Sequence, residues 1–308
     1  EKMEKKKILL AYYSQSGQIK EILDQFVSPL SSDENYEFFY HQIKPVNEYP
    51  FPWSSVQFFD AFPESVTEVG CELKPMPADL KQKYDLVVLG LQVWYLSPSI
   101  PVTAFLQSDD FKSVATNTPI ITINGCRNMW YMAQRSIIKY MQESKAKYTG
   151  HLVFFDKVNN LTSVITIMYW AFTGRKDKKW GVFPKPGISD KDISESSKYG
   201  AILKDKWETD DLDHLQEEFI KNKGVIVLPH LMSMEPKAKR IFKIWTKFVL
   251  KKGKAADPNR AGRLCLFKYY LLFMIYFLSP IATVIFYLTY PVFYSRIRKN
   301  IKFYKSVS

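Results

Sequence analysis

The chain has 308 residues, of which 46% are hydrophobic and 16% aromatic, so it can bury a large core and is not disordered in bulk. Its net charge of +12 is concentrated in residues 237–308, where 16 Lys and Arg accompany a single acid, Asp257, while residues 1–236 carry −3. A basic tail beside a long apolar run favours an anionic membrane surface as a partner and argues against nucleic acid.

Strand-like and helix-like patterns alternate over the first half of the chain, which predicts an α/β fold with a doubly wound, five-stranded parallel sheet. The expected strands are residues 7–13, 37–43, 86–90, 119–124 and 151–156, and the expected helices are 19–27, 98–106 and one that ends near 143. Two apolar insertions, 44–80 and 157–187, interrupt this pattern, and a polar helix is expected near 208–222.

The loop after the first strand, Ser14-Gln15-Ser16-Gly17-Gln18, is rich in hydroxyl groups and opens a helix. Backbone N–H groups and hydroxyls in such a loop bind an anion, and the helix N-terminus adds partial positive charge. The loop lacks G-K-[ST] and G-x-G-x-x-G, so it is neither a nucleotide-triphosphate loop nor a dinucleotide loop. It resembles the flavodoxin loop that holds the 5′-phosphate of FMN, and an ordinary capped turn is the alternative.

Two further loops follow the third and fourth expected strands, at the strand ends where doubly wound sheets bind ligands. The loop at Trp94 and Tyr95 resembles the one whose aromatic ring stacks on the flavin in flavodoxin-like enzymes, although core packing is the alternative. Together the three loops resemble a flavodoxin-like fold with strand order 2-1-3-4-5, and the resemblance implies FMN as the cofactor. The expected cofactor-binding residues are Ser14, Gln15, Ser16, Gly17, Gln18, Gln92, Val93, Trp94, Tyr95, Gly125, Cys126 and Arg127.

Over nearly its whole length the chain is also similar to the bacterial dialkylresorcinol condensing enzyme family of flexirubin and aryl-polyene pigment pathways. The resemblance is carried by residues 12–18, 51–65, 94–101 and 125–130. It implies a flavin-type aromatase that dehydrogenates a 2,5-dialkylcyclohexane-1,3-dione to a 2,5-dialkylresorcinol. It also implies a ketosynthase-like condensing partner, which builds the dione.

The three cysteines, Cys71, Cys126 and Cys265, are far apart in the sequence and form no C-x-x-C pair. Neither a metal site nor a disulfide framework is therefore predicted, and a reducing, cytoplasmic compartment is expected. None of them stands in the context of a ketosynthase nucleophile, so the condensation step belongs to the implied partner.

Dehydrogenation of the dione calls for a cation that stabilises its enolate. Arg127, on the third loop, is the expected cation, and Tyr95 is the expected hydrogen-bond partner of the second oxygen. Binding of the FMN edge or a surface ion pair is the alternative for Arg127, and packing is the alternative for Tyr95. The apolar segments 51–62 and 161–172 are expected to form a channel that brings a lipophilic substrate from the bilayer to the flavin.

Residues 236–308 are expected to form a membrane-associated unit that follows the flavin-binding domain of residues 1–235. Within the apolar segment 264–294, the uncharged run from Tyr269 has 26 residues, and about 20 suffice to cross a bilayer. Because both flanks are basic, a re-entrant or in-plane hairpin bent at Pro280 on the cytoplasmic face of the inner membrane is preferred over a single span. The amphipathic segment 239–251 is expected at the membrane interface, with packing on the main domain as the alternative.

Two other functions stay open at this stage. The first is a membrane-tethered NAD(P)H quinone or flavin reductase, although no NAD(P)H motif is found. The second is a non-catalytic scaffold for the ketosynthase partner. The sequence also leaves open a homodimer and the identity of the electron acceptor.

Overall fold

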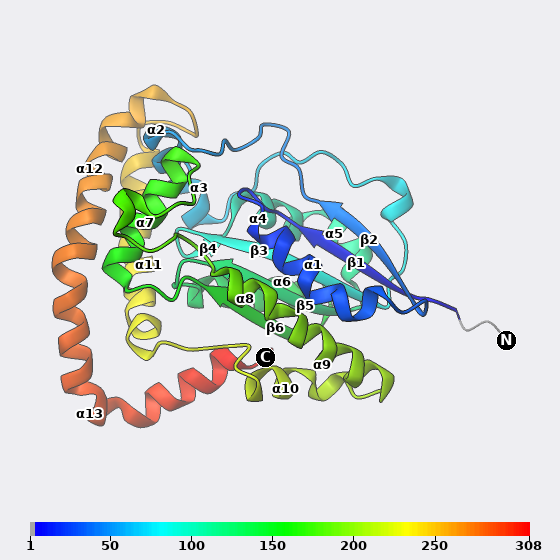
Figure 1. Cartoon of the computed structure of the whole chain (residues 1–308). Helices are drawn as coiled ribbons and strands as arrows, with labels where there is room; N and C mark the ends of the chain where they lie inside the picture. The colour runs from blue at the N-terminus through cyan, green and yellow to red at the C-terminus, as the bar shows by residue number, and fades with distance from the viewer. Residues whose placement is uncertain (1–3) are drawn as a thin grey trace.

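Five parallel strands form the central sheet of the computed structural model, which describes residues 4–308 (Figure 1). The strands are β1 (Lys6–Tyr12), β2 (Tyr36–Gln42), β3 (Leu86–Trp94), β5 (Pro119–Cys126) and β6 (Lys147–Phe155). They lie in the order β2-β1-β3-β5-β6, and a two-residue strand, β4 (Ser97–Pro98), pairs antiparallel with β3. With β4 set aside, this is the 2-1-3-4-5 order, whose topological switch point lies between β1 and β3.

Helices cover both faces of the sheet, so the strands read as nearly continuous apolar runs. Leu86 and Val88 of β3 face one layer, and Val87 and Leu89 face the other. The first layer contains α1 (Gln18–Ser31), α8 (Asp190–Ser194), α9 (Ser196–Glu208) and α10 (Leu215–Lys221). The second contains α4 (Ile100–Gln107), α5 (Asp109–Ala115) and α6 (Tyr131–Glu143).

The two insertions are helical. The first contains α2 (Ser55–Asp60), α3 (Phe62–Thr67) and a 3₁₀ turn (Ala78–Leu80), and the second contains α7 (Asn160–Thr173) and a 3₁₀ turn (Lys179–Gly181). The helix predicted near 208–222 is present but starts later, because α9 ends at Glu208 and a 3₁₀ turn (Leu212–His214) precedes α10. Asp210 adopts a left-handed conformation with φ of 53°, which prevents one helix from running through this region.

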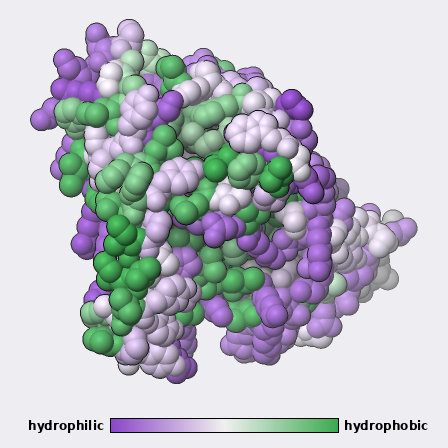
Figure 2. All heavy atoms as spheres, turned by 60° about the vertical axis from the view of Figure 1, so that its left-hand side comes forward, coloured by the Kyte–Doolittle hydropathy of each residue, from purple (hydrophilic) through white to green (hydrophobic). Residues whose placement is uncertain are grey.

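The C-terminal part of the chain consists of α11 (Pro229–Leu250), a 3₁₀ turn (Pro258–Arg260), α12 (Ala261–Phe273), a π-helical turn (Met274–Leu278) and α13 (Ser279–Lys305). We call residues 261–305 the strap. In Figure 1 the strap forms an arc along the outside of the molecule, and α11 lies between this arc and the sheet. Within the described residues, the run Pro258–Lys305 is the one helix that is long and apolar enough to cross a membrane, by length and composition alone. Figure 2 shows apolar side chains gathered in a band on this side of the molecule.

The hairpin predicted at Pro280 is wrong, because the chain does not reverse there. Pro280 lies inside the continuous helix Pro258–Lys305, directly after the π-helical turn Met274–Leu278. Local π-helical adjustment of this kind lets a helix continue through a proline. The amphipathic segment packs on the main domain, which was the alternative: in α11, the ring of Phe242 lies with its centroid 5.4 Å from that of Phe62 in α3. The expected boundary between residues 235 and 236 falls inside this helix.

Both ends of the strap are attached to the sheet domain. Beside its first residue, the fully buried Arg260 forms ion pairs with Asp60 (Nε–Oδ1 2.6 Å) and Glu64 (Nη1–Oε1 2.8 Å). Near its last residue, the hydroxyl of the buried Tyr304 accepts a hydrogen bond of 2.7 Å from Nε of Arg135. A helix that is held at both ends must follow the surface of the domain between them.

The contact between α1 and α9 allows no side chain at Gly200. A Cβ atom at this position would lie 1.7 Å from the backbone oxygen of Phe26. We expect Gly200→Ala to lower the free energy of unfolding by about 1–3 kcal/mol or more, because backbone atoms must move apart. Urea unfolding followed by circular dichroism measures this change.

Gly262→Ala is the matched control, because a Cβ atom at Gly262 on α12 would have no atom within 4 Å. Since alanine favours the helix, we expect this variant to gain about 0.5–1 kcal/mol. Equal effects of the two substitutions would contradict the described packing of α9 on α1.

Candidate functional site

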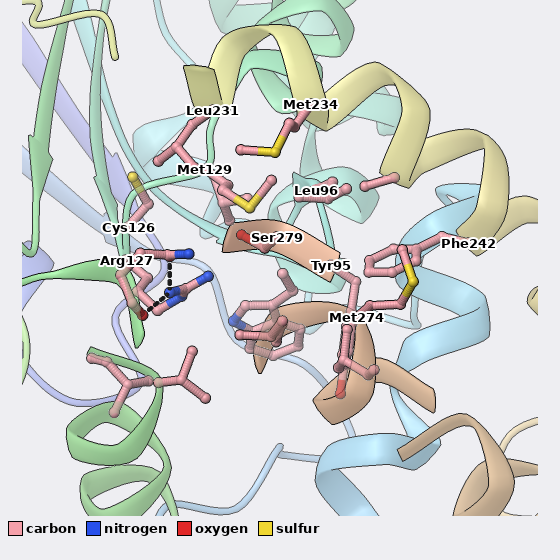
Figure 3. A pocket seen from close by; sticks show the side chains of 18 of the residues that line it. Tyr95, Leu96, Cys126, Arg127, Met129, Leu231, Met234, Phe242, Met274 and Ser279 are labelled. Atoms are coloured by element: carbon pink, nitrogen blue, oxygen red, sulfur yellow. Dashed lines mark hydrogen bonds between the residues drawn. The ribbon is translucent and has the colours of Figure 1, made fainter. Parts of the chain in front are cut away.

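The three loops singled out in the sequence meet at one cavity of about 970 Å³. The cavity begins at the C-terminal ends of the strands and extends to the inner side of the strap. Of the predicted site residues, it is lined by Gln15, Ser16, Gln18, Gln92, Val93, Trp94, Tyr95, Gly125, Cys126 and Arg127. In Figure 3, Arg127 and Cys126 lie on one side of this space, and Tyr95, Phe242 and Met274 lie on the other.

The first loop leaves donor groups free at the N-terminus of α1. Gly17 takes the N-cap position with φ of 93°, and no side chain caps the helix. The Oγ of Ser14 is buried, and it has no hydrogen-bond partner among the described residues. An uncapped helix N-terminus beside a buried hydroxyl is suited to an anion.

The two glutamine side chains of this loop have structural partners instead. Nε2 of Gln15 donates to the carbonyl of Pro50 at 2.8 Å, and Gln18 forms hydrogen bonds with both the N–H and the carbonyl of Ile188. These bonds hold two distant segments against the loop. Only the backbone N–H groups of Gln15 and Gln18 therefore remain available for the predicted contacts with an anion.

The second loop is a tight hairpin rather than an open loop. β3 continues past Gly90 to Trp94, and the turn to β4 is formed by Tyr95 and Leu96, with φ of 47° and 65°. Two bulky residues with positive φ store strain, which is typical of functional sites. Oε1 of Gln92, in the strand that leads to this turn, is buried without a partner among the described residues.

The aromatic residues of the hairpin have different surroundings. The ring of Trp94 meets Tyr49 and Trp53 edge-on, at centroid distances of 5.1 and 5.4 Å, and it also borders the cavity. The hydroxyl of Tyr95 donates to the carbonyl of Phe58 at 2.8 Å, and burial raises its pKa. Tyr95 therefore holds α2 in position, and its oxygen keeps lone pairs that can still accept a hydrogen bond.

The third loop brings a cation to the cavity. Nη1 of Arg127 donates to the side-chain oxygen of Asn160 at 2.7 Å, and no carboxylate in residues 4–308 forms an ion pair with it. Burial lowers the pKa of this guanidinium, and the charge of Asp156 opposes that shift. Burial also raises the pKa of the Cys126 thiol, so this cysteine is not suited to act as a thiolate.

Two residues of α11 that sequence reasoning missed support these loops. The buried carboxylate of Glu235 accepts backbone N–H bonds from Tyr131 and Met132 at the start of α6. One turn later, Nζ of Lys239 donates to the carbonyl of Leu96 at 3.3 Å. In the sequence, both residues look like the polar face of an amphipathic helix, and no local signal reveals their burial.

Basic side chains are the charged groups that line the cavity. These are Arg127, Arg135, Lys237, Arg240 and Arg296, and the lining within the described residues includes no Asp or Glu. The remaining lining is mostly apolar and comes from α2, α7, α11 and the strap. Such a cavity favours a lipophilic molecule that carries negative charge.

Comparison with protein families finds no matching model, and comparison with curated proteins finds no matching relative. Among solved structures, the chain is similar to a flavoprotein in complex with FMN from Lactobacillus acidophilus NCFM (19% identity, TM-score 0.34, 48% of this chain and 89% of that chain). It is also similar to oxidised flavodoxin 1 from Bacillus cereus (16% identity, TM-score 0.33, 63% and 95%). Because these TM-scores are low, the similarity assigns neither a family nor a function to this chain.

The burial of Glu235 predicts a pH dependence of stability. Desolvation raises the pKa of this carboxyl from 4.5 to about 7, although the two N–H donors oppose the shift. Between these pH values Glu235 binds more protons in the folded state than in the unfolded state, so this residue lowers the free energy of unfolding as the pH rises. The buried His151, whose pKa is lowered from 6.5 to about 4, acts in the opposite direction. Urea titrations between pH 4.5 and 7 measure this slope.

The variant Glu235→Gln should make the slope of the free energy of unfolding against pH more positive than in the parent protein, whereas Glu37→Gln, at an exposed position of β2, serves as the control. An equally steep slope in Glu235→Gln and the parent protein would show that Glu235 is not the titrating group.

Proposed function

We propose that this protein is a membrane-associated, FMN-dependent oxidoreductase that dehydrogenates a lipophilic ring ketone. The observation that supports this most directly is the shared cavity, which joins three loops at a topological switch point to an apolar, basic space under the strap. Switch points of doubly wound sheets are where such folds bind their ligands. The cytoplasmic face of the inner membrane is the proposed location, because the strap is apolar and its flanks are basic.

The residues present fit FMN. The uncapped N-terminus of α1, with Ser14 and Ser16, would hold the phosphate, since the hydroxyl of Ser14 lacks a partner among the described residues. Trp94 would border the ring, and the free Oε1 of Gln92 would accept a hydrogen bond from it. At Gly125 a Cβ atom would lie 2.5 Å from Ile19, so this glycine keeps the third loop close to α1. When bound, FMN supplies the two-electron acceptor.

The proposed substrate is a 2,5-dialkylcyclohexane-1,3-dione, and the product is the 2,5-dialkylresorcinol. The change removes two hydrogens, one as a proton and one with its electron pair, and leaves an aromatic ring. Arg127 would neutralise the enolate oxygen, because its guanidinium faces the cavity without a carboxylate partner in the described chain. The apolar residues of the cavity would hold the alkyl chains, each CH₂ contributing about 0.8 kcal/mol on burial. A ketosynthase-like partner would supply the dione.

Ser16→Asp tests the FMN site. A carboxylate at this position suits the helix dipole, so the variant should fold, but it repels the phosphate. Like charges in contact cost several kcal/mol, so we expect FMN affinity to fall at least 100-fold and the flavin absorbance of the purified protein to disappear. Ser113→Asp, at an exposed position of α5, is the control and should keep the flavin. A colourless parent protein that also ignores added FMN would refute the proposal.

Arg127→Met tests the role of the cation in turnover. Loss of a charge-stabilising donor commonly lowers kcat by about 10²–10³-fold, and we expect an effect of this size on dione dehydrogenation with FMN still bound. Arg175→Met is the control, because Arg175 is exposed and paired with Asp177 outside the cavity. A fully active Arg127→Met would remove this assignment. Bleaching of the flavin by NAD(P)H, with no reaction of the dione, would favour a quinone or flavin reductase instead.

A further inference from the structure

The strap has two apolar faces with different surroundings. Its inner face lines the cavity with residues such as Met274, Ile275 and Ala282. Its outer face exposes large apolar side chains, namely Leu266, Phe277, Ile281, Val284, Leu288 and Val292. An exposed apolar surface of this extent indicates a contact with a membrane or another protein.

The attachments at the two ends oppose a membrane crossing. Arg260 and Tyr304 are 44 positions apart and would lie about 66 Å from each other in a straight helix, more than the roughly 40–45 Å of a whole bilayer. A crossing would place these two residues on opposite sides of the membrane. Yet both are buried against the same sheet domain, and Gln216 of α10 also donates to the carbonyl of Lys305 at 2.8 Å. One of the two attachments would have to break.

The charges around the strap favour an anionic lipid surface over a second protein. Exposed basic side chains lie beyond both ends of the apolar face, and the same sign continues on the rim of the cavity. The set at the first end is Lys251, Lys252 and Lys254, and the set at the second is Arg296, Arg298, Lys299 and Lys302. Each such side chain near an anionic leaflet contributes about 1 kcal/mol, whereas a second copy of the chain would bring like charges together.

A second cavity, of about 400 Å³, lies between α7 and the strap at the π-helical turn. Its lining includes Tyr169, Phe172 and Tyr276. It shares Val164, Met168 and Leu272 with the main cavity, so these side chains form the boundary between the two spaces. An apolar hollow between α7 and the strap therefore lies directly beside the main cavity.

We infer that the strap lies in the plane of one anionic leaflet, with its outer face among the acyl chains. We further infer that alkyl chains enter the main cavity from that leaflet between α7 and the π-helical turn. The placement of the strap depends only on its own geometry and charge. The entry route rests on the proposed function, because it assumes that the substrate is a lipophilic molecule bound near the flavin.

Spin labels on the outer face test the placement of the strap. Leu266, Phe277 and Leu288 follow one another at intervals of 11 residues and are 54%, 63% and 75% exposed. We would label Leu266→Cys, Phe277→Cys and Leu288→Cys in full-length Cys265→Ser protein, bound to vesicles of 30% phosphatidylglycerol and 70% phosphatidylcholine. Relative accessibility to oxygen and to a water-soluble nickel complex gives the depth of each label. The unmodified Cys265→Ser parent reports any labelling of Cys71 and Cys126.

An in-plane strap predicts the same depth for all three labels, about 5–10 Å below the headgroup boundary. In a crossing helix, successive labels would differ by about 16 Å in depth, which would overturn the proposal. Full water accessibility of all three labels would overturn it as well. Spin–spin broadening, together with protection of the labels from the nickel complex in the absence of vesicles, would identify a second copy of the chain as the partner. None of these outcomes depends on flavin binding.

Met168→Trp tests the entry route, because the larger ring would fill the place where the two cavities meet. The readout is quenching of flavin fluorescence by a nitroxide-labelled C12 alkyl ketone delivered in the same vesicles, which requires no turnover. We expect at least a 10-fold slower quenching rate than in the control Ile244→Trp, which changes an exposed residue outside both cavities. Equal rates in a protein with full flavin absorbance would overturn the entry route and leave the proposed function standing.

Discussion

The attachment of the strap to the sheet domain at both of its ends is the constraint on which the rest of the structure depends. At one end, Arg260 is buried between two carboxylates, and at the other, Tyr304 is buried against α6. Breaking a buried ion pair by removing one partner costs about 3–5 kcal/mol, so these contacts favour one position of the strap. With its ends fixed, the strap closes the cavity at the switch point and turns its remaining apolar surface outward.

Polar and apolar groups occupy different parts of the closed cavity. Close to the sheet, the first loop offers free donors, and Arg127 of the third loop adds a cation. Toward the strap, the lining becomes apolar, and a second group of basic residues lies at its rim. An amphipathic ring with alkyl substituents has the same division between a polar and an apolar part.

Local patterns predicted the sheet and its loops well, because the strands are short apolar runs and each loop follows a strand end. The same reasoning failed wherever distant contacts decide the structure. Pro280 looked like the corner of a hairpin, but the π-helical turn that precedes it lets the helix continue. Glu235 and Lys239 looked solvent-exposed because their partners come from α6 and from the β3–β4 hairpin. The partners of Arg260 lie about 200 residues away in the sequence, and no spacing rule connects them.

The central claim is that one cavity holds both a flavin and the ring that reduces it. An anaerobic stopped-flow experiment tests this claim most directly, with FMN-loaded, full-length protein in anionic vesicles mixed with a 2,5-dialkylcyclohexane-1,3-dione. The account predicts loss of the oxidised flavin absorbance without any nicotinamide, and one resorcinol formed for each flavin reduced. An unchanged flavin spectrum at saturating dione, in protein that retains its FMN, would contradict it.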